Sequence, residues 1–230
     1  MTAAGTETTA GTGTTAGAGT TASRSHPIFA RLFERLARAG ERGPMGRDRA
    51  RLLAGASGRA IEVGAGSGAN FHHYPAQVNE VLAIEPEPYL RARAIEAAAA
   101  ARANVTVLAG EAAALPAEDA SFDFAVYSLV LCSVEDQAAA LAEARRVLRP
   151  GGELRFYEHV RSARALPARI QLLADATFWP SIAGGCHMAR ETLVSIESAG
   201  FAVEECERHG LPFAPKVPGF THILGRARRV

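Results

Sequence analysis

The sequence predicts an α/β fold with a seven-stranded, mainly parallel sheet, an antiparallel C-terminal hairpin and helices on both faces. After Gly58, short runs rich in β-branched and aromatic residues alternate with helical stretches, which is typical of parallel strands joined by crossover helices. Between the last two runs stand only Gly210, Pro212, Pro215 and their neighbours, which are too irregular for a crossover helix. These runs therefore predict the antiparallel hairpin, at the sheet edge.

The strands and two of the helices can be placed by their patterns. One helix is expected from Pro88 to Ala103, with the proline in the first turn, where a missing N–H costs nothing. Another opens with a capping-box pattern from Ser133 to Asp136 and stops at Arg149, before a Pro-Gly-Gly run. Strands are expected near residues 60–64, 80–85, 104–108, 122–128, 153–159, 201–207 and 220–227.

The chain divides into three parts before any site is considered. Residues 1–25 are almost entirely Thr, Ala and Gly, which predicts a disordered low-complexity tail. Residues 26–58 form an N-terminal helical segment, which either packs on the core or forms a lid over the site. Residues 59–230 form the main domain. The helix of that segment is predicted from an apolar stripe made of Ile28, Phe29, Leu32, Phe33 and Leu36. The helix is expected to end at Gly40, Gly43 and Pro44.

Composition limits the partners and the compartment. The 25 basic and 24 acidic residues give a formal net charge of +1, so no overall field attracts polyanions and no nucleic-acid partner is expected. No segment approaches the ~20 apolar residues that cross a bilayer, and no secretory signal is visible, so we expect a cytoplasmic protein without a membrane span. Cys132, Cys186 and Cys206 are odd in number and widely spaced, which fits a reducing compartment and predicts no metal site. The oligomeric state stays open.

A glycine-rich turn follows the first predicted strand and opens into a helix. Gly64, Ala65, Gly66 and Gly68, followed by Asn70, let the backbone approach a ligand closely. The same residues formally satisfy the G-x-G-x-x-G/A pattern of dinucleotide-binding folds. The turn alone therefore leaves two cofactors open, NAD and S-adenosylmethionine (SAM).

Carboxylates around the turn favour SAM. Glu62 would oppose a pyrophosphate but suits the cationic aminoacyl and sulfonium end of SAM. Glu85 ends the second strand, where a carboxylate can accept from both ribose hydroxyls, and Pro86 biases it toward extended geometry. After the third strand, Glu111 is placed to accept from the adenine amino group, although an exposed loop carboxylate is the alternative.

In strand order, these residues resemble class I SAM-dependent methyltransferases of the type 11 group, across residues 59–160. The resemblance implies a Rossmann-like fold, SAM as cofactor and S-adenosylhomocysteine (SAH) as product. Besides the residues above, it rests on Phe122-Asp123-Phe124 and on the run Arg146 to Gly152. The cofactor-binding residues that we expect are Glu62, Gly64, Ala65, Gly66, Gly68, Asn70, Glu85, Pro86, Gly110, Glu111, Ala112, Ser128 and Leu129.

A narrower resemblance extends to about residue 200. The runs Ser128 to Val134, Glu158-His159-Val160, Gly185-Cys186-His187 and Arg190-Glu191 are similar to the branch that includes animal thiol S-methyltransferases and bacterial relatives. This similarity implies a small-molecule acceptor with thiol chemistry. The hydrophobic N-terminal anchor of those animal proteins has no counterpart in the polar tail here, so membrane association is not carried over.

Methyl transfer from a sulfonium is an in-line displacement, so the enzyme has to align the acceptor, exclude water and supply its unprotonated form. Ligands of open parallel sheets gather at the carboxyl ends of the strands, which places Glu158 and His159 beside the methyl group. His159 is the candidate base, and a loop histidine bonded to a carbonyl is the alternative. Two other functions stay open, an NAD-dependent oxidoreductase and a non-catalytic SAM-binding protein.

Overall fold

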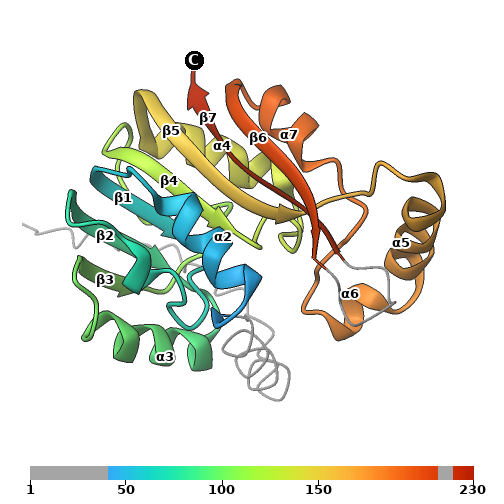
Figure 1. The fold of residues 1–230 in the computed structure, drawn as a ribbon. Helices are drawn as coiled ribbons and strands as arrows, with labels where there is room; N and C mark the ends of the chain where they lie inside the picture. The colour runs from blue at the N-terminus through green and yellow to red at the C-terminus, as the bar shows by residue number, and fades with distance from the viewer. Residues whose placement is uncertain (1–40, 212–219) are drawn as a thin grey trace, which may run out of the picture.

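The structure is a computed structural model that describes residues 41–211 and 220–230. It contains a single seven-stranded sheet with the order β3-β2-β1-β4-β5-β7-β6 (Figure 1). The tail over residues 1–25 and the helix expected before Gly40 lie outside the described residues. The lid hypothesis therefore stays a prediction.

All seven predicted strands are confirmed. The first five run parallel to one another, and β7 pairs antiparallel with both β5 and β6. The predicted antiparallel hairpin of the last two strands is thus confirmed, and within it β7 lies between β5 and the edge strand β6. The strands are β1 (Gly58–Val63), β2 (Val78–Ile84), β3 (Asn104–Leu108), β4 (Phe122–Ser128), β5 (Leu148–His159), β6 (Phe201–Leu211) and β7 (Phe220–Arg229).

Helices cover both faces of the sheet. Because side chains alternate along a strand, Ala60 and Ile61 of β1 belong to two different cores. One core contains Leu53 of α2, and the other contains Leu141 of α4 and Ile196 of α7. The helices are α2 (Pro44–Leu53), α3 (Pro88–Ala98), α4 (Gln137–Val147), α5 (Ala165–Thr177), α6 (Trp179–Ile182) and α7 (Thr192–Ser198), with a 3₁₀ turn η1 (Phe71–His73).

The boundaries differ from the sequence expectation around α4. The helix begins at Gln137 and is capped by Asp136, whose Oδ1 accepts from the N–H of Ala139 at 3.0 Å. The capping-box prediction from Ser133 is therefore wrong. The helix ends at Val147, and β5 already begins at Leu148, which pairs with Phe122 before the register shifts.

The boundaries of α3 and α2 also differ from the sequence expectation. Helix α3 ends at Ala98, five residues before the expected end at Ala103. Pro44 was expected to stop a helix, but it occupies the first turn of α2, where proline is well tolerated. Helix α2 was consequently missed as an element.

The pairing registers bring the carboxyl ends of four strands together. Val63 of β1 pairs with Ile84 of β2 on one side and with Tyr127 of β4 on the other. Tyr127 in turn pairs with Phe156 of β5. The residues that follow these positions therefore share one edge of the sheet, which is where ligands of open parallel sheets bind.

Candidate active site at the carboxyl ends of the strands

The glycine turn after β1 needs glycine for two different reasons. Gly64 has a φ of +67°, and a Cβ built on it would lie 2.5 Å from Cγ2 of Val130, so no side chain fits there. Gly66 has a φ of +58°, but its absent Cβ would point into open space. The backbone N–H groups of Gly64 and Ala65 donate to the carbonyl oxygen of Ile84 at 2.8 and 3.0 Å. The turn is thus tied to the end of β2 and open above Gly66.

Glu85 closes this turn from the neighbouring strand. Its buried carboxylate accepts from the backbone N–H of Gly66 at 2.7 Å and from that of Glu87 at 2.9 Å. Arg91 donates to the carbonyl oxygens of Glu85 and of Pro86, at 2.9 Å each, and so holds the segment in place. Burial raises the pKa of the Glu85 carboxyl. Each of its oxygens keeps a lone pair that can accept from a further donor.

Glu62 lies in a buried polar network behind the turn. Its two carboxylate oxygens accept from Nδ2 of Asn70 at 3.0 Å and from the hydroxyl of Tyr74 at 2.6 Å. Burial raises the pKa of Glu62 to about 7, against the lowering effect of these two donors. The structure brings the predicted residues Glu62 and Asn70 into direct contact, and adds Tyr74, which sequence reasoning missed.

Arg49 of α2 is a second buried residue that was missed. Its Nη1 donates to Oδ1 of Asn70 at 3.0 Å and to Oγ of Ser128 at 2.8 Å, and its Nε pairs with Glu41 at 2.8 Å. It therefore joins the glycine turn to the end of β4. Four arginines lie between residues 42 and 51, and nothing in the sequence distinguishes Arg49 among them.

The segment after β3 lies at the same edge. Gly110 approaches the end of β2 closely, since a Cβ there would lie 2.9 Å from Cγ2 of Ile84. Glu111 is exposed and forms a backbone bridge with Ala114. Ala112 is partly buried against the core. Glu111 is thus exposed to solvent in the segment that follows β3.

A strained turn follows β4. Leu129 has a φ of +63°, which is uncommon for a residue with a branched side chain. Its N–H donates to the carbonyl oxygen of Tyr157 at 2.7 Å. The turn thus directs residues 130–133 across the end of β5.

Glu158 holds this loop from beneath. Its carboxylate is fully buried and accepts from the backbone N–H groups of Val130, Leu131 and Cys132, at 2.9–3.0 Å. Burial raises the pKa of Glu158, although these three donors favour its charged form. The structure therefore directs this predicted catalytic carboxylate toward the loop backbone.

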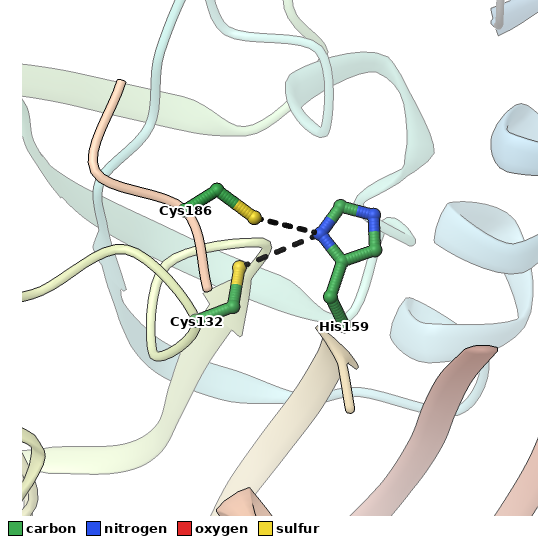
Figure 2. Close-up of side chains that lie close together, drawn as sticks. All are labelled: Cys132, His159 and Cys186. Carbon is green, nitrogen blue, oxygen red and sulfur yellow. Dashed lines mark hydrogen bonds between the residues drawn. The ribbon is translucent and has the colours of Figure 1, made fainter. Parts of the chain in front are cut away.

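His159, the other predicted catalytic residue, faces two cysteine thiols. Its Nδ1 lies 3.6 Å from Sγ of Cys132 and 3.3 Å from Sγ of Cys186 (Figure 2). The contact with the Cys132 thiol, together with that of the His159 ring, lowers the pKa of Cys186 to about 4 against the raising effect of burial. The contact with Cys186, together with burial, raises the pKa of Cys132. The wide sequence spacing of the cysteines gave no sign of this cluster.

The sequence of this chain is similar to those of known proteins. The sequence model of the family described as "Methyltransferase domain" matches residues 61–156. Thiol S-methyltransferase TMT1B of Mus musculus is 38% identical over 181 residues, which cover 76% of this chain and 73% of the relative. Human thiol S-methyltransferase TMT1A is 39% identical over 183 residues, which cover 76% of this chain and 73% of that relative.

This chain belongs to the SAM-dependent methyltransferases.

Solved structures agree on the fold of this methyltransferase. A SAM-dependent methyltransferase from Thermotoga maritima superimposes with a TM-score of 0.64 at 24% identity, over 88% of this chain and 99% of that one. Geranyl diphosphate methyltransferase in complex with SAM gives a TM-score of 0.63 at 13% identity, over 90% and 92%. These structures confirm the predicted Rossmann-like fold, and together with the family model and the sequence relatives they confirm the enzyme class and SAM as cofactor. The oxidoreductase and non-catalytic alternatives receive no support.

Within residues 41–211 and 220–230, no helix is long and apolar enough to cross a membrane.

Proposed function

We propose that this methyltransferase transfers the methyl group of SAM to the sulfur atom of a small-molecule thiol. The observation that carries the proposal is the 38% identity to a thiol S-methyltransferase over three quarters of the chain. The chemistry suits a thiol, because a free thiol with a pKa of ~8.5 is already a few per cent thiolate near neutral pH. Neither a strong base nor a covalent protein intermediate is then required.

The residues around the glycine turn suit the cofactor. The open space above Gly66 admits a ligand against the backbone, and the remaining lone pairs of Glu85 suit the two ribose hydroxyls. Glu111 lies at the rim for the adenine amino group, and Glu62, acting with Asn70, provides negative charge near the aminoacyl ammonium group. The other contacts that we propose come from Gly64, Ala65, Gly68, Pro86, Gly110, Ala112, Ser128 and Leu129.

The cationic Arg49, which the sequence did not reveal, completes this cofactor site. Its guanidinium lies between Ser128 and Asn70, so it is suited to the carboxylate of the aminoacyl group. Bound SAM supplies a methyl group on a positively charged sulfur, ready for displacement by a nucleophile.

The chain's own residues prepare the acceptor side. Glu158 holds the loop over residues 130–132, so its role is to position that loop. Cys132 and the end of β4 form one wall, and His159 lies at the end of β5, where it can assist loss of the thiol proton. Alignment and exclusion of water then lower the barrier.

A screen of SAH release over thiols, phenols, amines and carboxylates tests the proposal. We expect turnover with thiols and little with the other classes. Calorimetric titration with SAH serves as the control for an intact cofactor site. Tight SAH binding together with a clear preference for phenols, amines or carboxylates would refute thiol methylation.

A further inference from the structure

We propose that Cys132, His159 and Cys186 bind a zinc ion whose fourth coordination position takes the acceptor thiol as a thiolate. The inference rests on the proposed function and deepens it, because it assigns the means by which the acceptor loses its proton: His159 assists as a ligand of the ion and not as a base. The side chains of these three residues form a cluster and make none of the contacts described for the cofactor site. The ligand atoms of the three side chains all lie within 4.8 Å of one another.

The spacing of the ligand atoms is that of a tetrahedral zinc site. With Zn–S of about 2.3 Å and Zn–N of about 2.0–2.1 Å, tetrahedral angles place a sulfur and a nitrogen ligand about 3.6 Å apart. The two sulfur atoms lie 3.6 and 3.3 Å from Nδ1 of His159. In Figure 2 both sulfur atoms are directed at Nδ1, while the second ring nitrogen points away from them. Only small movements are therefore needed to admit an ion.

The donor set selects a thiophilic cation. Two thiols and an imidazole suit zinc, whereas magnesium and calcium prefer oxygen ligands. The carboxylate of Glu158, which holds the loop that carries Cys132, is already occupied by three backbone N–H groups and so does not complete the coordination. Three protein ligands with one open position are typical of catalytic zinc, whereas structural zinc has four protein ligands.

The three ligands come from separate segments that are held together before any ion binds. The backbone N–H of His187 donates to the carbonyl oxygen of Cys132 at 2.7 Å. Arg190 donates to the carbonyl oxygen of Leu131 at 2.6 Å. Gly185 has a φ of +85°, and a Cβ on it would lie 3.1 Å from the carbonyl oxygen of Ser133. The loop that carries Cys186 is thus packed directly against the loop that carries Cys132.

The cluster lies where the methyl group is delivered. Cys132 follows β4 and His159 ends β5, at the same sheet edge as the glycine turn. Val130, two residues before Cys132, covers the position where a Cβ of Gly64 would stand. A thiol held by the ion would therefore lie beside the cofactor site.

The reaction balances in atoms and charge. The negative charges of two cysteine thiolates, with a neutral histidine, neutralise Zn²⁺. The acceptor thiol binds as a thiolate, because the cation lowers the pKa of that thiol, and the thiol proton passes to solvent. The acceptor sulfur attacks the methyl carbon, an S–C bond forms, and the sulfonium C–S bond breaks with its electron pair left on the SAH sulfur. The neutral thioether is a weak ligand and leaves, and water takes its position.

Metal analysis of the full chain, purified under reducing conditions after expression with added zinc, provides the test. We expect about one zinc per chain, and replacement by Co²⁺ should produce sulfur-to-cobalt charge-transfer bands and the visible bands of a tetrahedral site. Cys132→Ser, Cys186→Ser and His159→Asn should each weaken metal binding by more than ~100-fold, because outer-sphere partners alone contribute ~10–100-fold. Cys206→Ser removes an exposed cysteine and should leave metal binding unchanged.

Calorimetric binding of SAH shows whether each variant is folded. A chain that binds SAH but neither zinc nor cobalt would overturn the metal site while leaving the proposed function intact. A Cys132–Cys186 disulfide that persists in zinc-saturated protein would overturn it as well. Metal binding with a tetrahedral cobalt spectrum, but no turnover of any thiol, would refute the proposed function and with it the open position for a thiolate.

Discussion

The hydroxyl of Tyr74 donates to Oε2 of Glu62 at 2.6 Å, and both side chains are buried behind the glycine turn. The carboxyl therefore has a proton affinity that differs between the folded and the unfolded chain. Burial raises its folded pKa to about 7, above the ordinary value of 4.5.

A Glu62→Gln variant should flatten the pH dependence of stability. Since the folded chain binds this proton more tightly, the stability contribution is present below the unfolded pKa and is lost as the pH rises through about 7. We expect the difference in unfolding free energy between about pH 5 and about pH 8 to change by up to roughly 3 kcal/mol relative to the parent chain. Urea titrations at both pH values measure it. Glu80→Gln is the control, and parallel curves for Glu62→Gln and the parent would contradict the prediction.

A Glu85→Gln variant should lose cofactor affinity. The amide keeps one acceptor oxygen where the carboxylate has two, so at least one hydrogen bond to a charged group is lost, which corresponds to about 10–100-fold in the Kd of SAH. Calorimetry measures the Kd. Glu87→Gln, two residues further along the chain, makes the same change in charge and should leave the Kd within a few-fold. Equal losses in the two variants would show that charge, and not position, matters.

Alanine at Gly64 and at Gly66 should have different effects. Both residues have positive φ, so each alanine costs on the order of 1 kcal/mol in backbone conformation. Gly64→Ala also forces the loop of Val130 away, and should lower the melting temperature further. The methyl group of Gly66→Ala meets no protein atom, so this variant should lose less stability. The same methyl group occupies the open space that we propose for the cofactor, so it should abolish SAH binding. A melting temperature lower for Gly66→Ala than for Gly64→Ala would disprove the distinction.

A Glu158→Gln variant should act through the loop that it holds. One amide oxygen cannot accept from all three N–H groups, and its NH₂ group faces at least one of them, which should cost about 2–3 kcal/mol in stability. We expect the turnover number to fall more than SAH affinity does, because the loop lines the acceptor side. Denaturant midpoints, SAH calorimetry and turnover separate the effects. Glu96→Gln, on the exposed side of α3, is the control; unchanged stability in Glu158→Gln would contradict the argument.

The elements that depend on local pattern could be predicted from the sequence. The alternating strands, the hairpin and the glycine turn follow from side-chain periodicity and from the special backbone freedom of glycine. Glu85 could be placed because it ends a strand at a set distance from the turn. Arg49 could not, since α2 begins at a proline and its arginines look alike along the chain.

The contact between Cys132 and Cys186 lay beyond sequence reasoning for a different reason. It depends on the path of the chain through α5 and α6, which returns residues 185–187 to the end of β4. Long-range proximity of this kind is set by tertiary packing and leaves no periodic signal. The same holds for Glu158, whose role depends on a loop 26–28 residues earlier in the chain.

The position of β7 between β5 and β6 has a consequence for synthesis of the protein. While the chain emerges from the ribosome, β5 is made before its outer neighbour, so an apolar strand edge stays open until residues 220–229 appear. Chaperone binding to nascent chains should therefore persist up to that point and end soon after it.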